Sequence, residues 1–328
     1  YKKMVFNMNL KWIKMYKIFI ITSLFFFNAC AKKNNSQNQN ETMTTNVTQI
    51  ENQKTYGIEV NSPVPIIIYL DDIKISERNT PMNTVVDLNP YLLRNGNYNL
   101  KLVVNPLFRK NESLVKLEHL KSIKLKFGSY LRDKKTDNIS NFHMDLNLPL
   151  YIPSDSVPYF EQEWKIDVKE LPYKLEGWSN GQDLSKLDKK ELEEKVLTFH
   201  EKVRKVLNTG NSEEWLKLTN KRLEEIKVFD YYDNDLLSND ISNIKLDVEK
   251  YAKNTMVPIE DYELKLYADG KLVTLERKNH TREYNNQDPL DLKGRSPLIS
   301  KGKVSGAADY PILLYLPQNS DEFVIIRK

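Results

Sequence analysis

The sequence predicts an α+β protein in which an antiparallel β domain is followed by a domain of helices and a second antiparallel sheet. From residue 56 to about 176, short apolar runs alternate with turn residues, as is typical of strands in antiparallel sheets. Beyond residue 184, apolar residues recur at spacings of three and four, which is typical of amphipathic helices. We therefore expect domains at residues 56–176 and 185–328, joined by a linker at residues 177–184.

The N-terminal domain contains several strand patterns. In residues 122–130, Ile123, Leu125 and Phe127 alternate with lysines, which is the two-residue period of a half-buried strand. Asn95-Gly96 is a turn signal immediately before another strand. The expected strands are residues 56–60, 65–70, 84–88, 98–104, 122–130 and 163–171.

Three helices are expected after the linker. Asp188 with Glu191 is a plausible cap for the first helix, and Gly210 ends it. Ser212 can cap the second helix, and residues 228–232 are expected to form a short strand before the third. The apolar stripes of the three helices are Leu192, Val196, Phe199, Val203 and Val206; then Trp215, Thr219, Leu223 and Ile226; then Ile241, Ile244, Val248 and Tyr251.

The clearest hairpin lies around Asp269-Gly270. A two-residue turn there would place Leu264 opposite Leu275 and Leu266 opposite Val273, which gives one apolar face. Residues 310–316 and 322–327 are expected as further strands, and residues 278–300 as a loop.

The order of helix, helix, short strand, helix and antiparallel sheet resembles that of the nuclear transport factor two-like (SnoaL-like) superfamily. The connection at residues 207–211, followed by Trp215, is similar to the turn between that family's first two helices. The resemblance implies a cone, in which a curved sheet wraps a long helix. Another α+β roll is the alternative.

Gly96, Tyr98 and Leu100 form a Gly-x-Tyr-x-Leu pattern. It resembles the corner of immunoglobulin-like sandwiches, in which a tyrosine returns its hydroxyl to the backbone. The resemblance implies that the N-terminal domain is an antiparallel β-sandwich. The alternative is a hairpin with an ordinary half-buried tyrosine.

The N-terminus has the pattern of a lipoprotein signal peptide, expected at residues 1–29. A basic stretch leads into a ten-residue apolar run at 18–27, which is far shorter than the roughly 20 residues of a membrane-spanning helix. Ala29-Cys30 follows and resembles the lipobox of bacterial lipoproteins, in a loosened form similar to that of Bacteroidetes. The resemblance implies that lipid on Cys30 anchors the protein to a membrane. A cleaved secretory peptide with an unmodified cysteine is the alternative.

The remaining composition narrows the possible partners. Removing residues 1–29 removes five lysines and no acids, which leaves 44 basic and 45 acidic residues and a net charge of −1. This balance gives no reason to expect nucleic-acid binding. Residues 30–55 are rich in asparagine and glutamine and are expected to be a disordered tether. No acidic cluster follows Cys30. We therefore expect the anchored protein to lie on the periplasmic face of the outer membrane.

The sequence offers few candidates for catalysis. Residues 177–181 fit the G-x-S-x-G pattern of hydrolases, with Ser179 as the nucleophile, but the buried strand and packed helix that a nucleophile needs are not expected around them, and a Gly/Ser/Asn linker explains the same residues. The four histidines form no metal-binding pair, so we expect neither a metal nor a cofactor.

The candidate pocket lies in the C-terminal domain. If residues 228–232 form a strand that lines a cone, then Tyr231, or Asp230 and Tyr232, would face its interior, and His200 would be a possible base. The alternatives are tyrosines packed in the core and a histidine at the surface.

Three functions are compatible with these patterns. The first is a membrane-anchored envelope protein that binds a protein or glycan partner. An antibacterial toxin that it neutralises is one version of such a partner. The second is an enzyme that acts on a small molecule in the C-terminal pocket. The sequence leaves open whether the protein is an enzyme. A glycan-binding lipoprotein is the third, with Trp164 and Trp178 as the aromatic platform.

Overall fold

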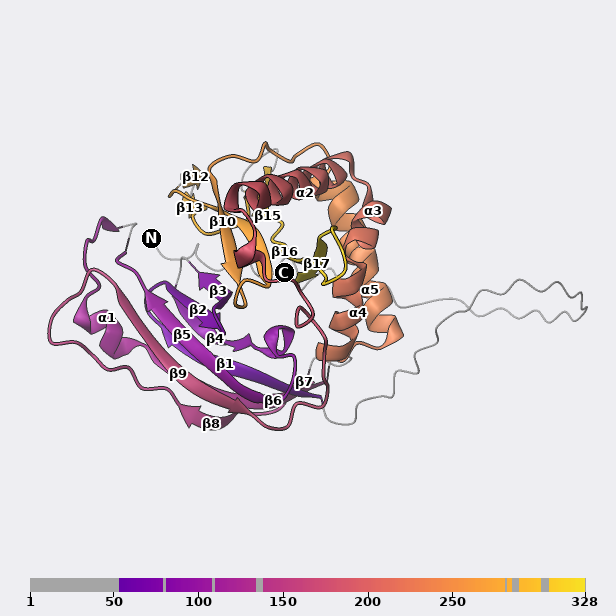
Figure 1. The fold of residues 1–328 in the computed structure, drawn as a ribbon. Coiled ribbons are helices and arrows are strands. Elements are labelled where there is room, and N and C mark those ends of the chain that lie inside the picture. Colours follow the sequence, from indigo (N-terminus) through magenta and orange to yellow (C-terminus); the bar gives the residue numbers. More distant parts are fainter. Residues whose placement is uncertain are drawn as a thin grey trace, which may run out of the picture. The chain divides into compact units, whose positions relative to one another are not determined.

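Helices and antiparallel sheets are both present in the computed structural model, which confirms the α+β class (Figure 1). The structure describes residues 53–78, 81–107, 110–133, 138–280, 282–284, 289–301 and 307–327. The expected signal peptide, Cys30 and nearly all of the expected tether lie outside these residues. Within them, no helix is both long enough and apolar enough to cross a membrane.

Two antiparallel sheets form the N-terminal region. The first has the order β4-β1-β6-β7, with β8 also paired to β6, and the second has the order β3-β2-β5-β9. The strands of the first are β1 (Lys54–Ser62), β4 (Met82–Asp87), β6 (Lys124–Asp133), β7 (Asn138–Ile139) and β8 (His143–Asn147). Those of the second are β2 (Ile66–Leu70), β3 (Ile73–Arg78), β5 (Gly96–Val104) and β9 (Phe160–Val168). A 3-10 turn, η2 (Asn89–Tyr91), and a short helix, α1 (Leu117–Ser122), complete the region.

All six expected strands of this region are present, each shifted by at most a few residues. β1 begins at Lys54, so the last two residues of the expected tether are in a strand, and Thr55 is buried. Apolar side chains from both sheets, including Ile58, Ile68 and Phe127, share one hydrophobic core.

Tyr98 makes the hydrogen bond that the corner pattern predicts. Its hydroxyl donates to the carbonyl oxygen of Arg94 at 2.6 Å, four residues upstream. The side chain is half-buried at the start of β5, and Leu100, two residues on, is in the core. The hydrogen bond therefore ties the turn before β5 to the strand itself.

Four helices and a π-helical turn open the C-terminal region: α2 (Lys189–Thr209), α3 (Ser212–Leu218), α4 (Asn220–Phe229), α5 (Asn234–Leu246) and the π-helix η5 (Asp247–Ala252). The predicted ends of α2 are confirmed. The Asp188 carboxylate accepts from the amides of Lys190 and Glu191 at 3.0 Å, and Gly210 ends the helix with φ 71°. The side chain of Asn211, not Ser212, caps α3.

The expected strand at residues 228–232 is wrong. Helix α4 continues to Phe229, because Leu223 and Phe229 are buried on its packed face. Tyr231 then adopts a left-handed backbone conformation with φ 56°, which is incompatible with a strand.

The prediction for the third apolar stripe is also wrong at its C-terminal end. Val248 is buried, but Tyr251 is 48% exposed and Ala252 takes the buried position. The π-helix from Asp247 adds residues to the turn and so rotates the stripe away from the α-helical period.

The C-terminal sheet has the order β10-β11-β16-β17, with strands β10 (Tyr262–Tyr267), β11 (Leu272–Arg277), β16 (Leu313–Tyr315) and β17 (Val324–Arg327). The predicted register is confirmed, because Leu264 pairs with Leu275 and Leu266 with Val273. The expected loop at 278–300 instead contains the short strands β12 (Arg282–Tyr284) and β13 (Pro289–Asp291) and the start of β14 (Ile299–Lys301), which pairs with β15 (Ala307–Asp309).

The two regions contact each other through buried groups. Ile73 of β3 packs with Trp178, Tyr267 and Ile326 in a shared hydrophobic cluster. The buried side chain of Asn89 accepts from the amide of Tyr56 at 3.0 Å and donates to the carbonyl of Phe229 at 3.2 Å. Residues 177–184 therefore lead into a packed interface, where Trp178 is only 7% exposed.

Candidate functional site

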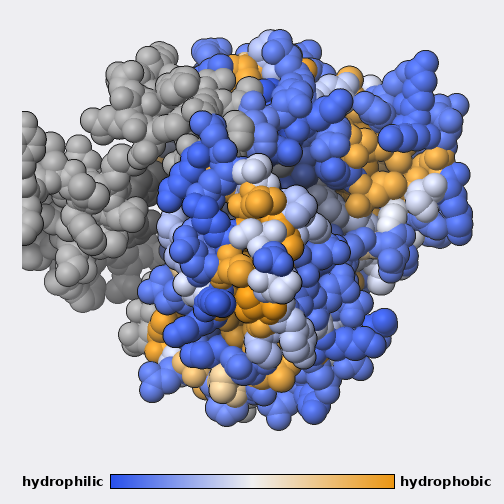
Figure 2. Space-filling model, turned by 90° about the vertical axis from the view of Figure 1, so that its left-hand side faces the viewer, coloured by the Kyte–Doolittle hydropathy of each residue, from blue (hydrophilic) through white to orange (hydrophobic). Residues whose placement is uncertain are grey.

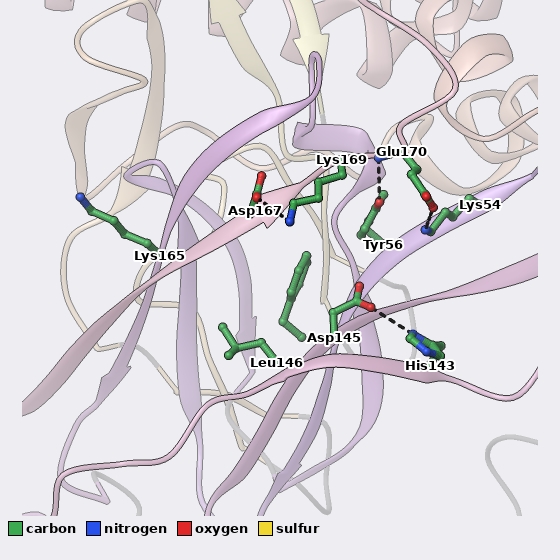
Figure 3. Close-up of a pocket in the computed structure, with 10 residues that line it drawn as sticks. Lys54, Tyr56, His143, Asp145, Leu146, Lys165, Asp167, Lys169 and Glu170 are labelled. Atoms are coloured by element: carbon green, nitrogen blue, oxygen red, sulfur yellow. Dashed lines mark hydrogen bonds and ion pairs between the residues drawn. The ribbon is translucent and has the colours of Figure 1, made fainter.

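A cleft of about 570 Å³ opens at the side of the N-terminal region, between strand β8 of one sheet and strand β9 of the other (Figure 3). Its walls come from the start of β1, from β6 and β8, and from the end of β9 with the two residues after it. The lining residues are Lys54, Tyr56, Phe127, His143, Asp145, Leu146, Lys165, Asp167, Lys169 and Glu170.

The floor of the cleft is apolar. The rings of Tyr56 and Phe127 stack with centroids 5.8 Å apart and an angle of 10° between their planes. Both residues belong to the hydrophobic core, so the cleft reaches down to the space between the two sheets. Leu146, which is 40% exposed, adds an apolar side chain to the β8 wall.

Charged pairs surround this floor. Lys54 and Glu170 are 2.6 Å apart, and the Glu170 amide donates to the Tyr56 hydroxyl at 3.2 Å. This ion pair joins the start of β1 to the chain after β9 at one end of the cleft. Burial alone would lower the pKa of Lys54, but its interactions with Glu170 and Tyr56 together outweigh burial, and the pKa is raised.

Two further pairs lie along the walls. His143 Nδ1 is 3.0 Å from Asp145, and Lys169 is 3.2 Å from Asp167. Lys165 has no ion-pair partner among the residues that the structure describes. The cleft nevertheless has no excess of formal charge, because its three lysines are matched by the carboxylates of Asp145, Asp167 and Glu170.

A glycine determines how β8 lies against β6. A β-carbon at Gly128 would overlap the carbonyl oxygen of His143, so only glycine permits this approach. The pairing shifts by one residue between Phe127 and Gly128, which leaves Asp145 as a bulge. β8 is not among the strands predicted from the sequence, although Met144 and Leu146 alternate with polar residues there; all five of its residues are exposed.

The chemistry of this cleft suits binding. An apolar floor with convergent charged groups is the usual composition of a ligand site. The His143–Asp145 pair is an arrangement that can orient a general base, but no serine, threonine or cysteine lines the cleft as a nucleophile.

No family model, no curated protein and no solved structure matches this chain.

Tyr231 lies at the interface between the two regions. It is 7% exposed, and its hydroxyl donates to the carbonyl oxygen of Lys54 and accepts from the side chain of Asn89 at 3.3 Å. Its ring also makes an edge contact with Tyr173. The side chain thus supports the first residue of β1, whose own side chain lines the cleft.

His200 is buried in α2, which contradicts the surface interpretation. Its Nδ1 is 2.8 Å from the carbonyl oxygen of Val196, and its Nε2 is buried with no hydrogen-bond partner in the described chain. Burial lowers its pKa to about 4, so the ring is neutral at pH 7.

Asp230 and Tyr232 lie at the end of α4, where both are half-buried. Burial, with Asp230 as a second cause, raises the pKa of Tyr232 to about 12. The structure therefore brings residues 230–232 together, while His200 lies on a different helix. None of these four residues lines the cleft.

The remaining candidates have ordinary structural roles. The Ser179 hydroxyl donates to the Glu176 carbonyl at 2.5 Å within an exposed turn, without the preceding buried strand that a nucleophile needs. Trp178 is buried beneath the guanidinium of Arg327, and the half-buried indole of Trp164 donates to the Pro149 carbonyl at 3.3 Å. In the described residues, no group of histidine, cysteine and acidic side chains could hold a metal ion.

Proposed function

We propose that this protein is a lipid-anchored envelope protein whose N-terminal region binds a partner in the cleft between β8 and β9. The cleft is the observation that carries the binding role, because it combines a stacked aromatic floor with charged side chains around it. Neutralisation of a toxin protein is one version of this role.

The anchoring part of the proposal is supported by the sequence around Cys30. The short apolar run before Ala29-Cys30 fits a lipoprotein signal, and the polar residues 31–52 can separate the anchor from the folded chain. A flexible chain of this size spans roughly 25 Å. We place the protein on the outer membrane, facing the periplasm.

The proposed fold of the N-terminal region is an immunoglobulin-like sandwich. Its support is the pair of sheets that share one core and the hydrogen bond from Tyr98 to Arg94. In this arrangement β6 pairs with β1, and β9 extends the sheet of β2 and β5.

The C-terminal region fits a cone-like roll less completely. Helix α2 packs its buried face against the sheet, since Val196 and Val203 share a core with Val273 and Leu314. The short strand of the superfamily pattern is replaced by helix α4.

A second candidate function is a small-molecule enzyme in the C-terminal region. The observation that favours it is the buried Nε2 atom of His200, which has no protein partner in the described chain. If a substrate reaches this atom, replacing His200 by phenylalanine should abolish turnover of that substrate. Unchanged turnover in a folded variant would remove this candidate.

The proposed anchoring is tested by fractionating cells that express the wild-type chain or the Cys30→Ser variant. We expect the wild type in the membrane fraction and the variant in the soluble envelope fraction, with the same unfolding free energy. A Ser36→Ala variant, which changes a hydroxyl in the same polar segment, is the control and should stay with the membrane. Retention of Cys30→Ser on the membrane would contradict the proposal.

A further inference from the structure

Three polar side chains at the junction of the two regions have no direct partner. They are Tyr91 of η2, Arg222 of α4 and Asp240 of α5, and all three are half-buried. In the part of the chain that the structure describes, none of these side chains makes a hydrogen bond or an ion pair. Their hydroxyl, guanidinium and carboxylate groups therefore keep their full capacity to bind something else.

The three groups lie within electrostatic reach of one another. Burial raises the pKa of Asp240, and the Arg222 guanidinium opposes that shift. Burial also raises the pKa of Tyr91, against the opposing charges of Arg327 and Arg222. In turn, burial lowers the pKa of Arg222, and Asp240 is the main group that opposes it. Arg222 is thus the common neighbour of a hydroxyl and a carboxylate that come from two other elements.

The contacts of Arg327 hold two of these elements together. Its guanidinium donates to the carbonyl oxygen of Pro90 and forms an ion pair of 2.7 Å with Glu225. Pro90 immediately precedes Tyr91 in η2, and Glu225 lies three residues after Arg222, so both residues are on the same side of α4. Arg327 of β17 therefore joins the backbone beside Tyr91 to the side of α4 that bears Arg222.

Arg327 itself is not available to a ligand. The side chains of Arg327 and Glu225 are only 2% and 5% exposed. The guanidinium lies over the rings of Trp178 and Phe229, 5.2 Å and 5.0 Å from their centroids. Glu225 compensates the charge of Arg327, whereas no described residue makes direct contact with the charge of Arg222.

Unused hydrogen-bonding groups in a half-buried position cost free energy. A guanidinium carries several N–H donors, and a carboxylate has acceptor sites on both oxygens. Groups of this kind in folded proteins bind ordered water or a ligand when no protein group satisfies them. Tyr91, Arg222 and Asp240 therefore have the composition of a small polar binding site that the chain does not fill itself.

The signs of the charges select the kind of ligand. A simple anion beside Arg222 would also meet Asp240 and its neighbour Asp230, whose charge already raises the pKa of Asp240. A simple cation beside Asp240 would meet the charges of Arg222 and Arg327. A neutral molecule would leave Arg222 and Asp240 without counter-charges in a half-buried site. A ligand that carries one charge of each sign compensates both residues.

We infer that Tyr91, Arg222 and Asp240 bind a small zwitterion of the α-amino-acid type at the junction of the two regions. The ligand's carboxylate accepts from the planar guanidinium of Arg222 and from the Tyr91 hydroxyl, and its ammonium group pairs with Asp240. None of these residues lines the cleft between β8 and β9, so the site is separate from the proposed partner-binding cleft and from the lipid anchor.

The exposed apolar surfaces do not carry an equivalent argument. Figure 2 shows the side of the molecule that bears α1, where hydrophobic residues gather among hydrophilic ones. Leu114 and Tyr151 are 42% and 79% exposed in the N-terminal region. Nothing in the structure indicates what would cover them.

The test uses the full mature chain and titration calorimetry with three matched probes. L-alanine has both charges, propionate is the same molecule without the ammonium group, and ethylamine is the same molecule without the carboxylate. We expect L-alanine to bind at least about tenfold more tightly than either analogue. The other common L-amino acids, titrated one at a time, show which side chain the site prefers.

Two variants assign the charges of the ligand to residues. Asp240→Asn should remove the preference for L-alanine over propionate, because the ammonium group loses its partner. Arg222→Met should remove the preference for L-alanine over ethylamine, because the carboxylate loses its partner. Arg94→Met and Asp321→Asn, which change exposed residues, are the controls and should keep both preferences. Urea unfolding verifies that all four variants fold.

Several outcomes would overturn the inference. They are no binding of L-alanine or of any other common L-amino acid at about 10 mM, equal binding of propionate, or unchanged preferences in Asp240→Asn and Arg222→Met. A crystal soaked in L-alanine that shows only water between Arg222 and Asp240 would assign these groups to a water-bridged ion pair instead. Each of these results leaves the cleft and the anchor untouched, so they are distinguishable from a failure of the proposed function.

Discussion

Lys74 of β3 and Glu276 of β11 form an ion pair of 2.7 Å that joins the N-terminal and C-terminal regions, with both side chains less than a tenth exposed. Lys74 also contacts Glu77 at 2.7 Å, and Glu276 accepts a hydrogen bond from Tyr267 at 2.6 Å. Burial lowers the pKa of Lys74, but the two carboxylates outweigh burial and raise it. Lys74 therefore stays charged inside the interface, and its ion pair with Glu276 fixes how the regions meet.

Lys74→Met should destabilise the protein by about 3–5 kcal/mol, because it leaves the carboxylate of Glu276 buried without its cation. The free energy of unfolding in urea measures this loss. Replacing Lys195, an exposed lysine of α2, by methionine should change it by less than about 0.5 kcal/mol. Equal effects of the two substitutions would show that the buried ion pair contributes nothing particular to the interface.

The stability of the protein should fall as the pH is lowered from 6.5 towards 4. His200 has its ordinary pKa near 6.5 in the unfolded chain and about 4 in the folded protein, so the unfolded chain binds the proton first. The contribution of the neutral His200 ring to the free energy of unfolding is present above pH 6.5. It is lost at about 1.4 kcal/mol per pH unit as the pH falls towards 4.

The His200→Phe variant lacks this titrating group, so the difference between its pH-dependent stability and that of the wild type measures the contribution of His200. Urea unfolding at several pH values should show a slope between pH 6.5 and 4 that is smaller by about one proton than in the wild type. His143→Phe, which replaces a histidine whose side chain is 79% exposed, is the control and is unfolded at the same pH values. An unchanged slope in His200→Phe would contradict the burial of this ring.

Tyr98→Phe should lower the free energy of unfolding by about 1 kcal/mol, because it deletes the hydrogen bond from the hydroxyl to the Arg94 carbonyl without changing the ring. Thermal or urea unfolding measures the loss. The matched control is Tyr151→Phe, at a tyrosine that is 79% exposed, and it should have almost no effect. A loss of the same size in both variants would argue against a structural role for the corner.

Gly128→Ala should displace β8 while leaving the hydrophobic core in place. The new methyl group would overlap the His143 carbonyl, and relieving such overlap costs about 1–3 kcal/mol. Hydrogen exchange should accelerate at the amides of residues 143–147 but not at those of β5. Lys126→Ala, two residues away on the same strand, should leave exchange in β8 nearly unchanged; protected β8 amides in Gly128→Ala would refute the close approach.

Much of the fold could be predicted from local sequence patterns. The caps of α2 and the register of the β10–β11 hairpin depend on neighbouring residues, and both are confirmed. The prediction of a strand at residues 228–232 failed because Phe229 belongs to the buried face of α4, which only tertiary packing reveals, and Tyr231 has a left-handed backbone conformation. The prediction of how far the third apolar stripe extends failed because a π-helical turn changes the period at which buried residues recur.

The candidate cleft could not be predicted, because its residues are far apart in the sequence. Lys54, Phe127, Leu146 and Lys165 meet only once two sheets have formed and β8 has paired with β6. Gly128 was a usable signal, since a glycine inside a strand often marks a bulge or a close backbone approach. Residues 230–232 and His200 were chosen from an expected cone, but residues 230–232 lie in the connection between α4 and α5, and His200 lies in α2.

The mass of the N-terminal peptide from the membrane-bound protein tests the central proposal most directly. Proteolysis and mass spectrometry should find a peptide that begins at Cys30 and carries two or three acyl chains, because one chain alone anchors a protein only marginally. A peptide that begins elsewhere, or one that contains an unmodified Cys30, would contradict the proposal that lipid holds this protein on the membrane.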